Sequence, residues 1–172
     1  VLHPATVLPA IEKNIPVRIL NSRRPHVEGT LITAEAPKST SLIRSIACKK
    51  NITVVTIVSS RMLGAHGFLR RIFEVFDRHE TPVDMLATSE VSVSLTVDDD
   101  AALGKAVDEL RRFGEVSIER DRGIVALVGA GLGGSSPSMA RALRAVGDER
   151  LHMVSLSSTG INLTLIVDDA KV

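Results

Sequence analysis

The chain has 172 residues and a formal net charge of +1, and 44% of its residues are hydrophobic and 24% are charged. This balance is typical of a globular protein with one ordinary domain or two small ones, and it excludes a disordered chain. A charge so close to zero predicts no strong attraction to nucleic acid or to an anionic membrane. The single cysteine, Cys48, excludes an internal disulfide and a thiolate metal cluster.

Two absences narrow the possible functions further. The longest apolar runs are far too short to span a bilayer, and no charged and apolar leader opens the chain, so we expect a cytoplasmic protein. The sequence has four Phe and no Trp or Tyr, which leaves its strands without the aromatic faces that bind single-stranded nucleic acid. Because the chain starts at Val1 and not at Met, we expect a piece of a longer protein or a processed protein.

The first 50 residues predict a helix and a strand followed by a connector. Pro4 and the apolar pattern after it indicate a short helix, although Pro9 limits its regularity. Alternating apolar residues predict a strand at residues 15–20. We therefore expect one helix and one strand in residues 1–22, followed by a connector at residues 23–50 that begins with turn-forming and charged residues.

Residues 51–122 have a regular pattern that predicts one small unit. A β-rich apolar run is followed by apolar residues at helical spacing, which is typical of an amphipathic helix packed on a sheet. Further on, apolar and polar residues alternate as in a half-buried strand. The expected elements follow the order βαββαβ, with strands at 52–58, 83–86, 91–97 and 115–119 and helices at 68–78 and 103–110.

Residues 123–172 begin a second copy of this unit. Ile161 to Asp169 line up with Val91 to Asp99, which is a repeat at a spacing of about 70 residues. The second copy lacks a last helix and strand, and the first 22 residues of the chain contain these two elements. We therefore predict an α+β fold of two ferredoxin-like βαββαβ domains, with the first inserted into the second and residues 1–22 completing the second.

A glycine-rich segment suggests a nucleotide-binding alternative. Gly129 to Gly134 match the G-x-G-x-x-G pattern between a predicted strand and a predicted helix. A dinucleotide site also needs an acid at the end of the next strand, and that strand ends at Leu156 followed by two serines. A flexible strand-to-helix turn is the better interpretation. The five histidines lack metal-site spacing and no serine or cysteine lies in a nucleophile motif, so we predict neither a metal site nor a catalytic residue.

The candidate binding site surrounds the loop before the helix at 68–78. Backbone N–H groups at a helix start attract a carboxylate, and Asp84 and Glu90 on the following strands attract an amine. This combination suits a small zwitterion such as an amino acid. In the second copy, Val154 and Gly160 align with the two acids, so we expect one specialised site and one structural partner.

Three motifs point to a known family. They are Arg61-Met-Leu-Gly-Ala-His-Gly-Phe-Leu, the pair Val83-Asp84 and Ala87-Thr-Ser-Glu-Val-Ser-Val-Ser-Leu. They closely resemble the regulatory region of the aspartate kinases. The opening Val1-Leu-His-Pro-Ala-Thr resembles the segment that joins the catalytic to the regulatory part of that family. The resemblance covers essentially the whole chain and implies a tandem pair of ACT domains, the first inserted into the second.

The resemblance also implies a role and a site. In this family the first ACT domains commonly pair side by side between subunits and bind effector there, which gives feedback control of the first step of the aspartate pathway. We therefore expect a homodimer through the first ACT domain and a separate catalytic domain that binds ATP and magnesium. For this chain alone we expect no cofactor and no catalysis. The expected effector contacts are Met62, Leu63, Gly64, Ala65, Gly67, Phe68, Leu69, Val83, Asp84, Thr88, Ser89 and Glu90.

The identity of the effector depends on the charges in this set. Backbone N–H groups around Gly64 to Leu69 would hold the carboxylate, and two acids facing one ligand favour lysine over threonine. Lysine-sensitive relatives often carry polar residues where this chain has Gly64 and Ala65, so threonine and S-adenosylmethionine stay open as effectors. A structural dimerisation module whose site has lapsed is the alternative function.

Overall fold

The computed structural model describes residues 4–35, 42–98, 102–129, 132–134 and 136–172. The chain divides into two compact parts, Val1–Thr40 and Ser41–Val172. In the first part, helix α1 (Pro4–Glu12) is followed by strands β1 (Val17–Ile19) and β2 (Thr30–Ile32), which pair antiparallel in a two-stranded sheet.

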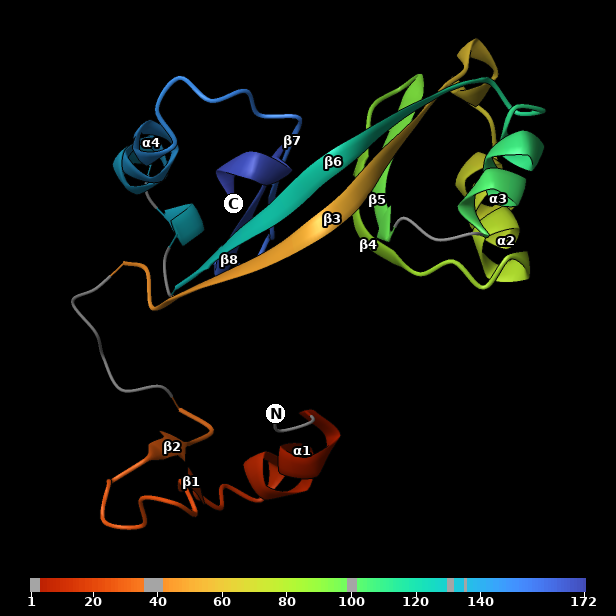
Figure 1. Ribbon diagram of the computed structural model, residues 1–172. Helices are drawn as coiled ribbons and strands as arrows, with labels where there is room; N and C mark the ends of the chain where they lie inside the picture. Colours follow the sequence, from red (N-terminus) through yellow and green to blue (C-terminus); the bar gives the residue numbers. More distant parts are fainter. Residues whose placement is uncertain (1–3, 36–41, 99–101, 130–131, 135) are drawn as a thin grey trace. The chain divides into compact units, whose positions relative to one another are not determined.

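The second part contains a six-stranded antiparallel sheet in the order β4-β5-β3-β6-β8-β7 (Figure 1). Its two central strands, β3 and β6, have 14 residues each. The strands are β3 (Ser45–Val58), β4 (Val83–Thr88), β5 (Ser92–Asp98), β6 (Glu115–Val128), β7 (Met153–Leu156) and β8 (Asn162–Asp168). The helices are α2 (Phe68–Arg78), α3 (Leu103–Leu110) and α4 (Ser136–Ala145), with short 3-10 turns η1 (Ser60–Met62), η2 (Leu132–Gly134) and η3 (Asp169–Lys171).

Each central strand is shared by two repeats. The first repeat uses residues 52–58 of β3, then α2, β4, β5 and α3, and residues 115–119 of β6, which gives the ferredoxin-like strand order β4-β5-β3-β6. The second repeat uses residues 123–128 of β6, then α4, β7 and β8. Residues 45–49 of β3 complete it by pairing with β6. The first repeat is therefore inserted into the second, which confirms the predicted fold.

The strand that completes the second repeat is not the one we expected. The sequence assigns this place to residues 15–20, whereas β1 pairs with β2, and residues 45–49 of the predicted connector fill the place. The polar run before Ile52 hides the continuity of β3, because Asn51 has a φ of 57° and the pairing with β6 shifts register there. Asparagine tolerates this left-handed conformation, so the strand continues past it. The role of the helix in residues 1–22 stays a prediction.

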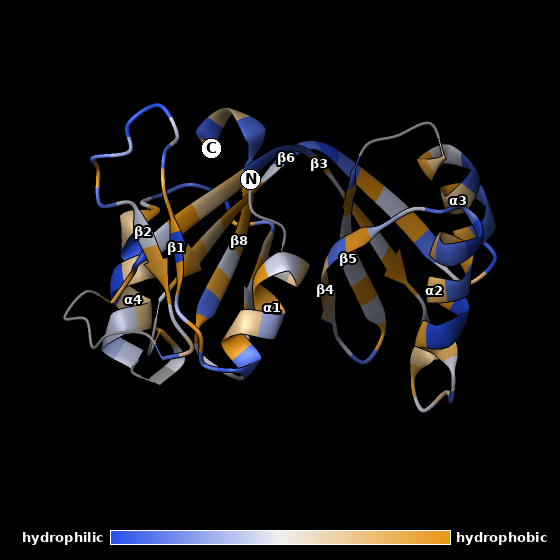
Figure 2. Cartoon of the chain, turned by 90° about the horizontal axis from the view of Figure 1, so that it is seen from below, coloured by the Kyte–Doolittle hydropathy of each residue, from blue (hydrophilic) through white to orange (hydrophobic). Residues whose placement is uncertain are grey.

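Helices α2 and α3 cover one face of the first repeat and hold the loop before α2 in place. The helices have hydrophilic outer sides (Figure 2). The residues that α2 buries lie three or four positions apart, as the sequence predicts. The buried side chains of the two helices are Phe68, Ile72, Val75, Phe76, Leu103, Ala106, Val107 and Leu110.

A smaller core lies on the opposite face of the sheet and joins the two repeats. It consists of Val54, Met85, Met153 and Ile166, with Ile124 packed against it. Strands β4 and β7 contact each other here although they are the two edges of the sheet, so the sheet is curled around this core. In the part of the chain that the structure describes, no helix has the length and apolar character needed to cross a membrane.

Candidate functional site

The loop between β3 and α2 places unpaired backbone donors at the start of α2. Gly64 and Gly67 have φ values of 66° and 71°, which favour glycine, and Gly67 caps α2 without a side chain. The N–H of Arg71 donates to the carbonyl of Gly67, so the N–H groups of the preceding turn have no acceptor within the helix. The first turn of α2 can therefore bind an anion.

Three of the predicted residues also contribute to packing. Phe68 is buried in the core, and the partly buried side chains of Met62 and Leu69 pack against it, whereas Leu63 is exposed. The N–H groups of Leu63 and Ala65 donate to carbonyls within the loop, so Ala65 is not available as one of the predicted donors to a carboxylate.

The turn between β4 and β5 lies at the same end of the sheet as this loop. Thr88 pairs with Val93 of β5, and Val93 pairs with Ile57 near the end of β3. The N–H of Ser59 also donates to the carbonyl of Val91 over 2.8 Å. The structure thus brings the loop residues together with Thr88, Ser89 and Glu90.

Within the turn, the two polar side chains that follow Thr88 differ in function. The Ser89 hydroxyl lies 2.6 Å from the Ser92 hydroxyl and accepts the Ser92 N–H over 3.1 Å, so it stabilises the turn. The exposed carboxylate of Glu90 makes no ion pair with any described residue. Among the predicted site residues at this end of the sheet, Glu90 is therefore an acid that is free to meet an amine.

Asp84 lies at the opposite end of β4. It lies four positions before Thr88, which corresponds to about 13 Å along a strand. A register shift between Val83 and Met85 makes Asp84 the bulged residue of the strand. Val83 packs against the core that contains Phe68 and that Met62 and Leu69 also contact, so Val83 shares a core with the loop residues. Within one chain, Asp84 is therefore the predicted site residue that lies away from the loop.

The Asp84 carboxylate is already paired with a lysine. Nζ of Lys49 lies 2.6 Å from Oδ2 of Asp84 and 2.8 Å from Oδ1 of Asp98. The hydrogen bond to Asp84, followed by that to Asp98, raises the pKa of Lys49 above its usual value. Lys49 and Asp84 line an open cleft of about 410 Å³, together with Met85, Ile124, Ala126, Ser155, Asn162 and Thr164. The sequence gives no sign of this pair because its members lie 35 positions apart.

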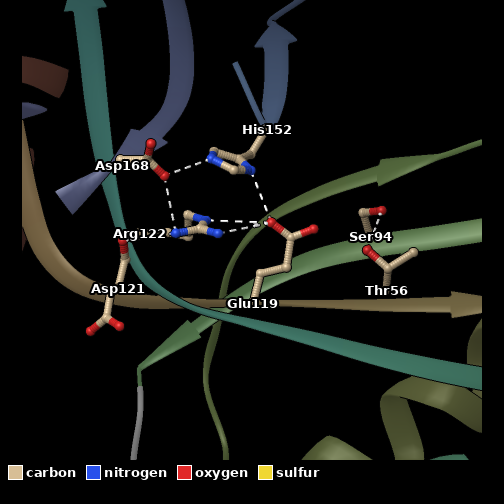
Figure 3. A network of polar contacts seen from close by, with 7 residues as sticks. All are labelled: Thr56, Ser94, Glu119, Asp121, Arg122, His152 and Asp168. Carbon is tan, nitrogen blue, oxygen red and sulfur yellow. Dashed lines mark hydrogen bonds and ion pairs between the residues drawn. The ribbon is translucent and has the colours of Figure 1, made fainter. Parts of the chain in front are cut away.

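A related cluster lies at the corresponding place of the second repeat (Figure 3). The ring nitrogens of His152, whose side chain is 3% exposed, lie 2.9 Å from Oε2 of Glu119 and 2.9 Å from Oδ1 of Asp168. Arg122 binds the same two carboxylates over 3.2 and 3.0 Å. The hydrogen bond from His152 lowers the pKa of Asp168 below its usual value, and Arg122 adds to this shift. Both carboxylates of this cluster are therefore paired internally.

His152, and not Val154, is the structural counterpart of Asp84. Met85 pairs with Thr96, and Met153 pairs with Ile166, so the two methionines occupy equivalent positions. The hairpin loop of the second repeat is two residues longer: six residues lie between the paired Leu156 and Leu163, whereas four lie between Thr88 and Val93. The predicted alignment of the two copies is therefore wrong by two residues before this loop.

The glycine-rich segment before α4 forms a packed turn in the residues that are described; Ala130, Gly131 and Ser135 lie outside them. The N–H groups of Gly129 and Gly133 donate to the carbonyls of Ile161 and Gly160 over 2.8 and 3.1 Å. A Cβ at Gly133 would lie 2.8 Å from Cα of Gly160. These glycines therefore allow close backbone packing and do not leave their N–H groups free for phosphates.

Comparison with known proteins links this fold and site to one family. Residues 55–112 match the family model described as ACT domain. Aspartokinase 3, chloroplastic, from Arabidopsis thaliana is 38% identical over 180 residues, which cover 98% of this chain and 32% of that protein. The lysine-sensitive aspartokinase 3 of Escherichia coli is 33% identical over 99% of this chain and 40% of its own length. The chain thus spans about a third of the length of the first curated relatives that it matches.

Two solved structures resemble the chain closely. Escherichia coli aspartokinase III, in complex with lysine and aspartate in the T-state, superposes with a TM-score of 0.84 and 34% identity, over 99% of this chain and 39% of that one. A putative C-terminal regulatory domain of aspartate kinase from Porphyromonas gingivalis superposes with a TM-score of 0.65 and 35% identity, over 76% of this chain and 89% of that one.

Proposed function

The chain belongs to the aspartokinase family and contains its regulatory ACT region, and we propose that it binds lysine as a feedback effector. The observation that carries the proposal is the start of α2, which has no side-chain cap, beside the β4–β5 turn, where Glu90 makes no ion pair with a described residue. The N–H groups of the helix start bind the effector carboxylate, and the acid binds an ammonium group.

Lysine fits this arrangement because it has two ammonium groups. Glu90 provides one acid, and Asp84 provides the second. The lysine-sensitive relative from Escherichia coli and the lysine complex of its structural counterpart support this choice for the family. Threonine and S-adenosylmethionine stay alternatives, because Gly64 and Ala65 offer no polar side chain to a cationic ligand.

A second copy of the chain brings Asp84 to the effector. Within one chain Asp84 lies about 13 Å along β4 from the turn, too far for one small ligand to contact both. Strand β4 is an edge strand of the sheet, and two such edges that pair antiparallel across a two-fold axis set the start of one strand beside the end of the other. In such a homodimer, Asp84 of one protomer faces the loop and turn of its partner.

Effector binding controls a kinase that extends beyond this chain. We place ATP, magnesium and aspartate in the part of the protein outside this chain, and we expect the whole protein in the cytoplasm. Lysine shifts the kinase toward a less active state only to the extent that it binds that state more tightly.

Isothermal titration calorimetry with lysine, threonine, methionine and S-adenosylmethionine tests the proposal. We expect lysine to bind, and a Glu90→Gln variant to bind it about tenfold more weakly, because one charge-assisted hydrogen bond is lost. Asp77→Asn removes the same charge from an exposed position of α2 and should leave the affinity unchanged. If no amino acid binds, the chain is a structural dimerisation module, and sedimentation would still show a dimer.

A further inference from the structure

The ion cluster around Lys49 links the two repeats. Asp84 and Asp98 belong to β4 and β5 of the first repeat, whereas Lys49 belongs to the stretch of β3 that completes the second repeat. The Lys49 ammonium group contacts both carboxylates at 2.6 and 2.8 Å. One side chain of the second repeat therefore occupies the place at Asp84 where an external ammonium group would bind.

The corresponding cluster of the second repeat has its charges exchanged. His152 takes the place of Asp84, and Glu119 takes the place of Lys49. The second match follows from strand pairing. Val54 and Ile124 are equivalent residues of the two repeats, and they pair with Glu119 and Lys49, respectively. In that cluster two carboxylates face two bases, His152 and Arg122. In the first repeat two carboxylates share one lysine. The Lys49 cluster therefore has an excess of one negative charge, whereas each carboxylate of its twin contacts both His152 and Arg122.

We propose that Lys49 is a built-in competitor for the effector ammonium group at Asp84. The inference rests on the function proposed above and adds a step to it. When lysine binds, its ammonium group takes Asp84, and Lys49 keeps its second contact, Asp98. Lys49 is thus not left without a partner, and the exchange needs no large movement.

The exchange also gives the effector a route to the second repeat. Releasing Lys49 from Asp84 breaks a link between the first repeat and residues 45–49 of β3, which form the fourth strand of the second repeat. The side chains of Lys49 and Asp84 are 44% and 35% exposed, and an exposed pair of this kind is weak enough to be displaced by a ligand. Binding in one repeat therefore changes a contact of the other.

Calorimetric titration of lysine into the full chain and its Lys49→Met variant tests the proposal. A ligand that must first displace a bound competitor gains affinity when the competitor is removed. We expect lysine to bind Lys49→Met about fivefold more tightly than the parent chain, which corresponds to an exposed ion pair at the upper end of its usual strength. Lys50→Met is the matched control, because Lys50 contacts a backbone carbonyl of Asp169 and neither carboxylate of the cluster.

The outcomes separate this inference from the function on which it rests. Tighter binding to Lys49→Met with unchanged binding to Lys50→Met supports the competitor role. Equal or weaker binding to Lys49→Met, while the parent chain binds lysine, overturns the competitor role and leaves the proposed function standing. If neither protein binds lysine, both the competitor role and the proposed function are wrong. Lys49→Gln, which keeps a polar side chain, repeats the test should the methionine variant fold poorly by circular dichroism.

Discussion

Removing His152 should destabilise the fold more than removing Lys49, although the two residues belong to equivalent ion clusters. The His152 side chain is 3% exposed and contacts two carboxylates at 2.9 Å. The Lys49 side chain is 44% exposed. Burial is therefore the main difference between the two clusters.

The expected magnitudes follow from this difference in burial. Removing one partner of a buried ion pair costs about 3–5 kcal/mol, but Glu119 and Asp168 are 40% and 46% exposed and keep Arg122 as a partner. We therefore expect His152→Leu to lower the free energy of unfolding by about 2 kcal/mol. Lys49→Met removes an exposed pair and should lower it by less than about 1 kcal/mol.

Urea denaturation followed by circular dichroism measures both values. For a protein of this size the denaturation slope is about 2 kcal/mol per molar urea, so His152→Leu should move the midpoint by about 1 M and Lys49→Met by less than half of that. Equal shifts for the two variants would refute the claim that burial sets the strength of these clusters. The parent slope must be kept in both variants, because a changed slope indicates a changed unfolded state.

Three further predictions concern the same folded part. Because the pKa of Asp168 is lower in the folded chain, Asp168 stabilises the fold at a pH above its unfolded pKa near 4. This contribution disappears as the pH falls through the lowered pKa of the folded chain. Acid should therefore destabilise the parent chain more than the His152→Leu variant, as measured by thermal unfolding between pH 5 and 2. Gly133→Ala should lower the free energy of unfolding by about 1–3 kcal/mol, because the new Cβ would lie 2.8 Å from Cα of Gly160. Gly104→Ala in α3 should raise it by about 0.5–1 kcal/mol, because a Cβ there has nothing within 4 Å. Urea midpoints measure both changes. Phe76→Ala should cost about 3–5 kcal/mol by the same assay, since this side chain is 2% exposed in the first core, and a smaller loss would mean that the core collapses around the cavity.

Most of the first repeat could be predicted from the sequence because its signals are local. The helical spacing from Phe68 to Phe76 and the alternation from Val91 to Val97 each lie within one element, and the structure confirms both. The loop and turn around Gly67 and Glu90 are also local, and their neighbourhood follows from the strand order.

The features that the sequence does not reveal are those that join distant segments. Residues 45–49 look like a connector because Lys49, Lys50 and Asn51 form a polar run, and the strand that they continue is recognisable only through its pairing with β6. Asp84 looks like a free ligand group, because its partner Lys49 lies 35 residues earlier in the chain. His152 looks like a loop histidine, since its match to Asp84 depends on a hairpin loop that is two residues longer.

Shared strands connect the two repeats through their ion clusters. Strand β3 carries Lys49 in its second-repeat stretch, and β6 carries Glu119 in its first-repeat stretch, so each cluster connects a strand of one repeat to the hairpin of the other. In the cluster at His152 each carboxylate contacts both His152 and Arg122, while in the more exposed cluster at Lys49 two carboxylates share one ammonium group. Under the proposed function, an external ammonium group opens the connection at Lys49 and leaves the one at His152 closed. The proposal thus places the ligand response in the first repeat and a fixed support in the second.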